Sequence, residues 1–417
     1  MLQKGYQQAS DLLLIFGLFF LSNVSAFIAV LWLIPEFVFF EFVFWLMLTA
    51  LSVWILNKNG LLSNLFENLK KNWFILPFLI FSGFSIFWSV YREISFYRWS
   101  ILLFTIITGG YIGLRQNIQQ IIKILSFFGV CILFLSAVLV FFAPRIGVMN
   151  YYIIQGAWKG VYWHKNHMGL IAAFINILFL LNVVYSSQSG RGGILPWGLL
   201  YFISLLIVYE TDSAAAYITT ILLHGAVLLA LILLKFRERI HRYHYLIFLT
   251  IIIFVSLILY MNIDRFIGIF NRNTTLTGRV PMWTHLFDTY VSRRPLLGYG
   301  FNAFWYLESH RVEMQQAAGY PDPIVIADNG FIDLLVNTGY SGLVLFSIFY
   351  FGAWWHSLKY ASKAKDINGV FPALLMFYTL LANISWSLLF ENESFIMLIM
   401  ISVLFSISRN TPINFEG

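Results

Sequence analysis

Apolar stretches long enough to cross a lipid bilayer recur along the whole chain. A hydrocarbon layer of roughly 30 Å requires about 20 apolar residues in a helix. Strands of a β-barrel would be shorter and would alternate between apolar and polar residues, so the pattern favours helices. We therefore predict an all-α polytopic membrane protein of about twelve transmembrane helices, forming a single integral membrane domain over residues 1–417. The predicted spans are residues 11–32, 36–56, 72–90, 97–114, 121–143, 165–185, 194–209, 212–234, 245–261, 329–356, 369–389 and 392–408.

The composition agrees with this pattern. Of the 417 residues, 60% are apolar and 11% are charged, whereas soluble domains are about 45–50% apolar and about 25% charged. The first apolar stretch has little basic character before it and no small-residue cleavage signal after it, so we expect a retained span rather than a signal peptide. A single Cys131 within an apolar run excludes an internal disulfide framework and a thiolate metal site.

Basic residues assign the two sides of the membrane. Twelve spans place both termini on one side, and the segments on that side carry most of the Lys and Arg residues. By the positive-inside rule this side is the cytoplasm, so we expect both termini to be cytoplasmic. The net charge of +7 follows this distribution, and we expect membrane lipids rather than nucleic acid as partners of the basic segments.

One long loop, residues 262–327, lies on the opposite, external side and departs from the charge bias. Its six basic residues are all Arg, the side chain whose planar fork binds phosphate with two hydrogen bonds. Any one of them can instead pair with an acidic residue of the loop or with a lipid headgroup. For the set as a whole we predict an anionic ligand. The six residues are Arg265, Arg272, Arg279, Arg293, Arg294 and Arg311.

The loop has predicted structure of its own. Thr277 can cap a helix in which Pro281 lies in the first turn, where its missing N–H costs little. Arg279 and Trp283 then share one face of this helix, four residues apart. The helix ends near Arg293 and Arg294, and a glycine-containing turn leads into an aromatic stretch. Its aromatic residues, Trp305 among them, suit either anchoring in the membrane interface or stacking on sugar rings.

The next span begins with a run of polar residues. Asp328 or Asn329 is a suitable helix N-cap. Asn329, Asp333 and Asn337 recur every four residues along a stripe that enters the apolar layer, and an ionisable residue there is costly enough to indicate function. Both a structural and a functional role for Asp333 therefore stay open.

A second polar segment, residues 158–169, precedes the sixth span on the same external side. Lys165 lies at a helix N-terminus, against the dipole preference, which indicates a nearby anion. His164 and His167 are three residues apart rather than the four of a helical metal-binding pair, and no third ligand is evident, so we predict no metal site. Arg98, at the start of the fourth span, adds a further cation to this face.

In this order and spacing, these segments resemble the O-antigen ligase and polysaccharide polymerase superfamily of bacterial envelope enzymes, in particular its exopolysaccharide branch. The resemblance covers about residues 85 to 345. It is carried by Trp88-Ser89, His164-Lys165-Asn166 with Gly169, Leu276-Thr277-Gly278-Arg279 with Trp283, Arg294-Pro295-Leu296-Leu297-Gly298-Tyr299-Gly300 with Phe304-Trp305, and Asp328-Asn329-Gly330 with Asp333-Leu334-Leu335 and Gly339 to Gly342.

The resemblance implies an inverting glycosyl transfer on the external face of the bacterial cytoplasmic membrane, without metal ion or other cofactor. The donor would be an undecaprenyl-pyrophosphate-linked glycan, and the acceptor a sugar hydroxyl on a second lipid-linked molecule. A lipid A-core acceptor or a chain-length regulator would be further partners. Arg279 matches the most familiar donor-binding position, and a fixed Arg fork suits the charge that develops on a pyrophosphate leaving group. The residues expected to bind the donor and glycan with it are Arg98, Lys165, Trp283, Arg293, Arg294, Asn329 and Trp305.

The sequence departs from the family at two positions. Asp328 stands where many members carry His as the acceptor-activating group. A carboxylate at a helix N-terminus is expected to have a low pKa, which makes it a weaker base than His. Many members also carry a cation beside the residue that matches Ser213, which this chain lacks. Lys165, Arg98 and Arg294 are the candidates to replace that cation.

Three functions are compatible with these residues. The first is a polymerase that joins lipid-linked repeat units, favoured by the stretch from Arg279 to Trp305. The second is a ligase that transfers finished glycan to lipid A-core or to a protein. The third is a flippase or transporter of lipid-linked glycans. Transporters usually have two related halves and polar residues near the midplane, whereas the polar groups here gather at one external face.

Overall fold

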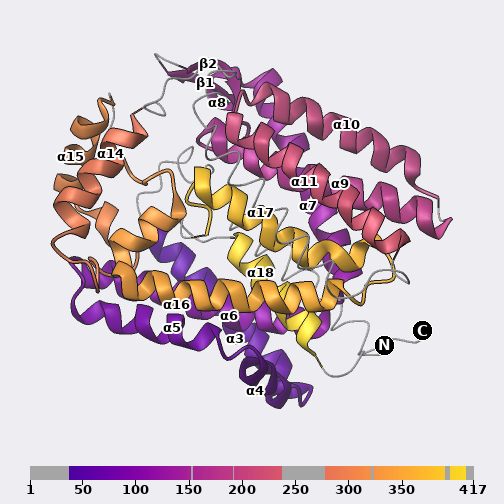
Figure 1. Cartoon of the computed structure of the whole chain (residues 1–417), viewed down its shortest axis with the longest axis horizontal. Helices are drawn as coiled ribbons and strands as arrows, with labels where there is room; N and C mark the ends of the chain where they lie inside the picture. Colours follow the sequence, from indigo (N-terminus) through magenta and orange to yellow (C-terminus); the bar gives the residue numbers. More distant parts are fainter. Residues whose placement is uncertain are drawn as a thin grey trace.

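The computed structural model describes residues 37–151, 154–190, 192–236, 278–320, 324–389 and 395–409. In these segments the chain forms a bundle of helices with one small sheet at its edge (Figure 1). The predicted spans 11–32 and 245–261 and residues 262–277, with Arg265 and Arg272, lie outside the described residues. The principal helices are α3 (Phe37–Lys58), α4 (Leu62–Lys71), α5 (Ile75–Phe84), α6 (Arg92–Arg115), α7 (Ile118–Phe142), α9 (Lys165–Ser189), α10 (Ile194–Glu210), α11 (Ala214–Lys235), α14 (Arg279–His285), α15 (Glu308–Ala318), α16 (Gly330–Ala361), α17 (Phe371–Ser385) and α18 (Phe395–Ser408).

Several of these helices are long and apolar enough to cross a membrane, which confirms the prediction of a helical membrane protein. Within the described segments there are five such helices, or six if the bent pair Phe42–Lys58 and Leu62–Lys71 counts as one span. The chain bends by 109° between the two members of that pair. The five helices are Ile118–Phe142, Lys165–Ser189, Ala214–Lys235, Gly330–Ala361 and Ile367–Ser385. The total of twelve spans stays a prediction.

Two features differ from the predicted arrangement of spans and connections. Strands β1 (Val148–Tyr151) and β2 (Ile154–Trp158) pair antiparallel, so the fold is not strictly all-α. They are too short to produce the longer alternation by which a strand is recognised in a sequence. Helix α4, in a segment expected to be a cytoplasmic connection, is short and amphipathic, with Leu65 buried and its charged residues outward.

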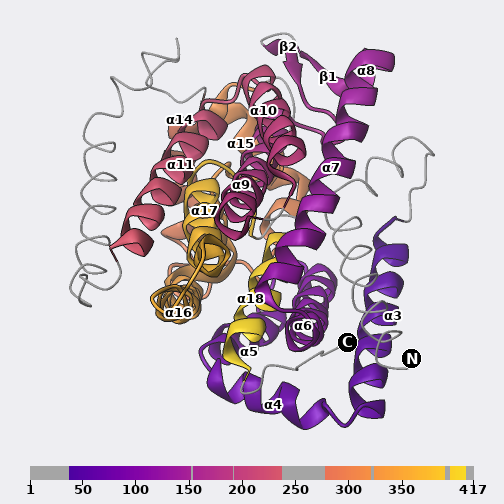
Figure 2. The same ribbon diagram turned by 90° about the vertical axis from the view of Figure 1, so that its right-hand side faces the viewer.

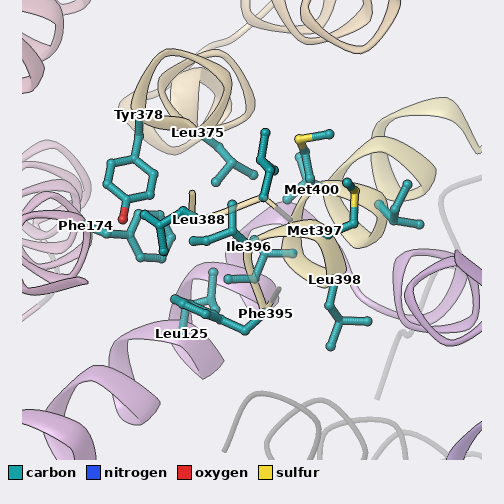
Figure 3. Packing of buried hydrophobic residues seen from close by; sticks show 14 of the residues in the cluster. Leu125, Phe174, Leu375, Tyr378, Leu388, Phe395, Ile396, Met397, Leu398 and Met400 are labelled. Atoms are coloured by element: carbon teal, nitrogen blue, oxygen red, sulfur yellow. The ribbon is translucent and has the colours of Figure 1, made fainter. Parts of the chain in front are cut away.

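The core lies where α9, α17 and α18 meet. In α9, 78% of the most apolar window is buried inside the protein, against 33% in α11. Figure 3 shows Phe395, Ile396 and Met400 of α18 packed beside side chains of the neighbouring helices. The hydroxyl of Tyr378 in α17 donates a hydrogen bond to the Leu170 carbonyl in α9, at 3.0 Å, which satisfies a polar group that is otherwise surrounded by apolar ones.

Helix α16, seen nearly end-on in Figure 2, is broken at Gly339, whose φ of 66° and ψ of −174° are not helical. The loop segment 295–300 lies in this break. The amides of Tyr299 and Gly300 donate to the carbonyls of residues 336 and 337, and the amides of residues 340 and 341 donate to Pro295 and Leu296. Backbone groups freed by the break therefore regain partners from the loop, as a membrane interior requires.

Two glycines make this close contact possible. Gly298 has a φ of +63°, and a Cβ atom there would lie 2.6 Å from the backbone of Asn337. At Gly339 a Cβ atom would lie 2.3 Å from the backbone of Leu296. Because neither backbone can move away, the two segments fit only without side chains at these positions. The long loop is thus fixed to a transmembrane helix near the point where that helix begins.

Candidate active site

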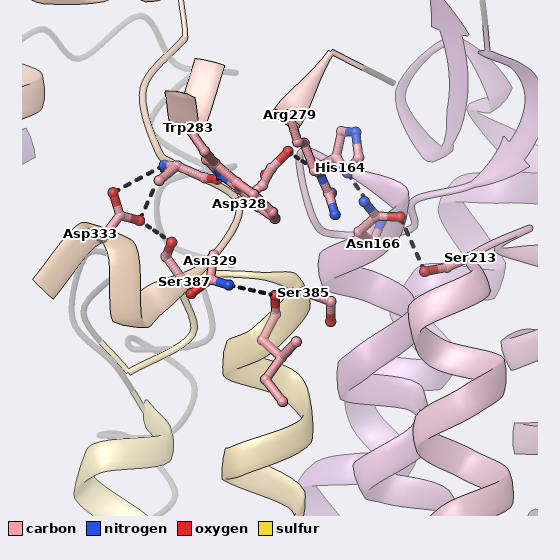
Figure 4. Close-up of polar contacts among 12 residues, drawn as sticks. His164, Asn166, Ser213, Arg279, Trp283, Asp328, Asn329, Asp333, Ser385 and Ser387 are labelled. Carbon is pink, nitrogen blue, oxygen red and sulfur yellow. Dashed lines mark hydrogen bonds and ion pairs between the residues drawn. The ribbon is translucent and has the colours of Figure 1, made fainter. Parts of the chain in front are cut away.

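The predicted site residues from three helices converge at one end of the bundle (Figure 4). His164 precedes α9, Ser213 precedes α11 and Asp328 lies two residues before α16. Arg279 is the first residue of α14, which packs over them. Helices that begin on the same side of a membrane bring their N-terminal ends together, so sequence segments more than a hundred residues apart contribute to one site.

Arg279 and Asp328 form an ion pair in this site. The Nε–H of Arg279 donates to Oδ2 of Asp328 at 2.9 Å, and the two side chains are only 18% and 17% exposed. Asp328 has a φ of 54°, an uncommon value for a residue other than glycine. The two terminal nitrogens of Arg279 make no hydrogen bond to any residue that the structure describes. These two nitrogens are therefore the part of the guanidinium that can donate hydrogen bonds to an anionic ligand.

Trp283 holds the backbone next to this pair. Its indole N–H donates to the carbonyl of Ala327 at 2.8 Å. Arg279 and Trp283 thus bind two consecutive residues, Ala327 and Asp328, as expected for side chains on one face of the predicted helix. Thr277, the expected cap, lies outside the described residues, and Gly278 in a left-handed conformation occupies the N-cap position.

Asp333 holds the segment before α16 in place through hydrogen bonds to its carboxyl group. Its carboxyl oxygens accept hydrogen bonds from the Trp305 indole at 2.6 Å, the Ala327 amide at 3.0 Å and the hydroxyl of Ser387. Asn329 caps α16 and donates to the Ile384 carbonyl at 3.1 Å. These contacts join the long loop, α16 and the end of α17. The stripe of polar residues predicted on α16 therefore anchors the loop that carries Asp328.

On the opposite side of Arg279, His164 and Asn166 line the site. Nδ1 of His164 accepts the backbone N–H of Asn166 at 3.1 Å, which caps α9. The Asn166 side-chain oxygen accepts from the Ser213 hydroxyl at 3.1 Å, so Ser213 links α11 to α9. The His164 ring stacks on Trp386, with centroids 5.0 Å apart and an interplanar angle of 19°. The imidazole is consequently held in one orientation.

The electrostatics of the site correct one expectation. Burial raises the pKa of Asp328 above its ordinary value, and the Arg279 charge only partly opposes this. The expected low pKa is therefore wrong, because loss of solvation outweighs the favourable position before a helix. His164 shows the reverse: burial, followed by the charges of Arg279 and Lys165, lowers its pKa to about 3. At neutral pH His164 is an uncharged imidazole.

The remaining predicted cations have partners of other kinds. Lys165 lies beside Ser213, but its ammonium donates to the Asp212 carboxylate at 2.8 Å. Arg98 is buried, with its guanidinium over the rings of Tyr97 and Tyr306. The guanidinium of Arg294 lies 4.8 Å from the Tyr299 ring, and Arg293 is exposed. The structure thus places Lys165 close to the position of the missing family cation, and the three arginines beside the aromatic 295–306 segment.

Some residues of the site were not predicted from the sequence. Trp386 and Ser387 follow α17 and contact His164 and Asp333 respectively. The only sequence signal was a polar and aromatic interruption, Ser385-Trp386-Ser387, between apolar helices. His164 was noted as part of a motif, but without a role. Its position beside Arg279 depends on how two distant segments fold together, which no local pattern reports.

The arrangement suits an anion next to a neutral polar ligand. Arg279 offers its two terminal NH2 groups at a mostly buried position, where charge-assisted hydrogen bonds are stronger than in water. Asp328 is a carboxyl group with a raised pKa, which makes it a better proton acceptor than an ordinary aspartate. Among the residues described, no three His, Cys, Asp or Glu side chains gather as metal ligands would.

Comparisons with known proteins agree with this arrangement. A family model described as O-antigen ligase matches residues 199–347, which include α14, the 295–300 segment and the start of α16. The chain is also 26% identical over 298 residues to the exopolysaccharide production protein ExoQ of Rhizobium meliloti (strain 1021). That match covers 68% of this chain and 65% of ExoQ, slightly less than two thirds of the relative's length. The two matches confirm the similarity of this integral membrane protein to the O-antigen ligase and polysaccharide polymerase superfamily.

Proposed function

We propose that the protein is an inverting, metal-independent glycosyltransferase that polymerises undecaprenyl-pyrophosphate-linked oligosaccharide repeat units. The observation that carries the proposal is the Arg279–Asp328 pair, a cation and a carboxyl group in one mostly buried site at the junction of three helix ends. The chain would cross the bacterial cytoplasmic membrane about twelve times. Both termini would lie in the cytoplasm, and residues 262–327 would form part of an external active site.

In the proposed reaction, the terminal N–H groups of Arg279 bind the pyrophosphate of the donor. An acceptor sugar hydroxyl attacks the anomeric carbon from the face opposite the pyrophosphate. The carbon–oxygen bond to phosphate breaks, and undecaprenyl pyrophosphate leaves with the bonding electrons. Asp328 takes the proton of the attacking hydroxyl, and Arg279 stabilises the charge that develops on the leaving group. Attack from the opposite face inverts the configuration at the anomeric carbon.

Reconstitution tests the proposal. The purified protein is placed in lipid vesicles with an undecaprenyl-pyrophosphate-linked repeat unit, first alone and then with lipid A-core, in the presence of a metal chelator. We expect chain growth with the repeat unit alone. Transfer only to lipid A-core would identify a ligase, a function that the description of the matched family favours. Absence of both products would contradict a glycosyltransferase and favour a transporter.

A further inference from the structure

Beside Arg279 lies a cluster of two indole rings and one imidazole ring that has no role in the proposed reaction. Trp163 is 44% exposed, although Tyr162 before it and Trp386 beside it are buried. Its ring contacts those of His164 and Trp386, with centroids 5.7 Å and 6.0 Å away. The three rings form one cluster, which we name the Trp163 platform, defined as Trp163, His164 and Trp386. His164 is held by stacking on the buried Trp386, so that of the three rings Trp163 is the one with a broad exposed apolar face.

His164 gives this platform a directed hydrogen-bond donor. Since Nδ1 accepts the Asn166 N–H, the neutral ring carries its proton on Nε2. Nε2 makes no hydrogen bond to any residue that the structure describes. Figure 4 shows the ring beside the Arg279 side chain, with its second nitrogen directed away from α9. Arg279 also lies near enough for its positive charge to help lower the pKa of His164.

We propose that the Trp163 platform is a sugar subsite, in which the ring of Trp163 stacks on the pyranose next to the donor pyrophosphate and Nε2–H of His164 donates to one of its hydroxyl groups. The inference rests on the proposed function, because Arg279 must hold the pyrophosphate for the first sugar to reach the platform. A pyranose has an apolar face of C–H groups and a polar rim. It therefore matches an exposed indole with a donor at its edge.

The charge of the site indicates that the ligand at the platform is a sugar rather than a second phosphate. Phosphate is bound best by cations with several N–H groups, and the charged Arg279 supplies these. His164 stays neutral next to two cations, so it adds a donor without adding charge. A neutral donor suits a hydroxyl group of a sugar. The site is thus divided into a charged part for the pyrophosphate and an uncharged part for the glycan.

The alternative role for Trp163 is anchoring in the membrane interface, for which exposed Trp residues are commonly used. The two roles differ in their dependence on sugar. An interface anchor affects undecaprenyl pyrophosphate and its glycosylated form alike. A sugar subsite affects only the glycosylated form.

The test measures equilibrium binding of the full chain in lipid nanodiscs to two ligands, undecaprenyl pyrophosphate and the lipid-linked oligosaccharide extracted from the producing cells. We expect Trp163→Ala and His164→Asn each to weaken oligosaccharide binding by about threefold to tenfold and to leave undecaprenyl pyrophosphate binding unchanged. Asn retains the helix cap, because its side-chain oxygen accepts the same backbone N–H. Trp163→Phe, which keeps an aromatic face, should bind both ligands nearly as well as the wild type.

Two controls separate the outcomes. Trp73→Ala removes another exposed Trp, 59% exposed, that lies between α4 and α5, and it should change neither affinity. Arg279→Ala should weaken both ligands. If Trp163→Ala and His164→Asn weaken both ligands equally, or neither, while Arg279→Ala weakens both, the sugar subsite is wrong and the proposed donor site stands. If Arg279→Ala changes neither affinity, the donor site is wrong, and the placement of the sugar on the platform next to the pyrophosphate is wrong with it.

Discussion

Arg279 and Asp328 are 49 residues apart in the chain, and the Nε–H of Arg279 donates to Oδ2 of Asp328 at 2.9 Å. Only one nitrogen of the guanidinium is used in this contact. The carboxylate therefore orients the arginine without occupying the fork that suits a pyrophosphate. In return, the arginine partly offsets the burial that raises the pKa of Asp328. Each residue sets the properties of the other, so substitutions at the two positions have coupled effects.

Replacing Arg279 should abolish polymer formation without reducing the amount of protein in the membrane. In Arg279→Ala the donor pyrophosphate loses its cation, and we expect a fall in rate of at least about a hundredfold. The protein should still fold, because Asp328 can take up a proton when its partner is absent, which its raised pKa favours. Polymer is measured by gel electrophoresis of extracted glycan, and abundance by immunoblot.

Arg279→Lys is the matched variant. It keeps the positive charge beside Asp328 but lacks the planar fork. Its rate should lie between those of the wild type and Arg279→Ala. Normal polymer length and yield in Arg279→Ala would contradict the assignment of this residue to the donor site.

Asp328 should control the acidic side of the pH–rate profile. If it accepts the acceptor proton, the rate falls when the pH drops through its pKa and the carboxyl becomes protonated. Since burial raises that pKa, the fall should begin at a higher pH than for an ordinary aspartate. In Asp328→His activity should be kept or increased at neutral pH, and the acidic fall should move upward toward the imidazole range, near about 6.5.

Asp328→Asn is the control, because it keeps the size of the side chain but cannot accept the proton. It should be inactive at every pH while folding normally. Loss of activity in both variants, with normal folding, would instead indicate a structural role for this position.

The sequence predicted the pieces of this site but not how they are assembled. The spacing of Arg279 and Trp283 predicted a shared helix face, and in the structure both side chains bind one segment, at the consecutive residues Asp328 and Ala327. The apolar pattern predicted helices, because the length of a membrane span is set by the bilayer. The pairing of Arg279 with Asp328 was not predicted. It depends on long-range packing, for which a single sequence carries no periodic signal.

The role of the polar residues at the start of α16 was likewise not decided by the sequence alone. The four-residue spacing of Asn329, Asp333 and Asn337 predicted a stripe that enters the apolar layer, and left open whether it binds substrate. In the structure Asp333 accepts hydrogen bonds from Trp305 and Ala327, and Asn337 accepts the Phe304 amide at 3.1 Å. The contacts needed to recognise an anchor come from the loop, which the pattern of the helix alone does not contain.

Asp333→Asn should therefore reduce activity by displacing Asp328 rather than by removing a reacting group. One carboxyl oxygen becomes an N–H₂ group that faces donors, which leaves buried hydrogen-bonding groups unsatisfied at a cost of about 1–3 kcal/mol. We expect faster proteolysis within residues 324–329 and a lower maximal rate. Asp366→Asn is the control, since Asp366 caps a short helix by accepting the Gly369 amide and Asn serves equally well there. Equal proteolysis of the Asp333→Asn variant and the wild type would contradict the anchoring role.

The contact between Gly298 and the break in α16 should be the part of the fold most sensitive to a single methyl group. Gly298→Ala adds a Cβ atom 2.6 Å from the backbone of Asn337, and its φ of +63° is unfavourable for alanine by about 1–2 kcal/mol. Gly319→Ala separates these two effects, because Gly319 has a φ of +70° but no atom within 4 Å of the added methyl group. Gly319→Ala should lower the thermal midpoint in detergent slightly. Gly298→Ala should reduce it much further or prevent recovery of monodisperse protein, since the 295–300 segment would leave the break and expose the backbone groups of α16. Equal effects of the two substitutions would show that the loop does not depend on this close contact.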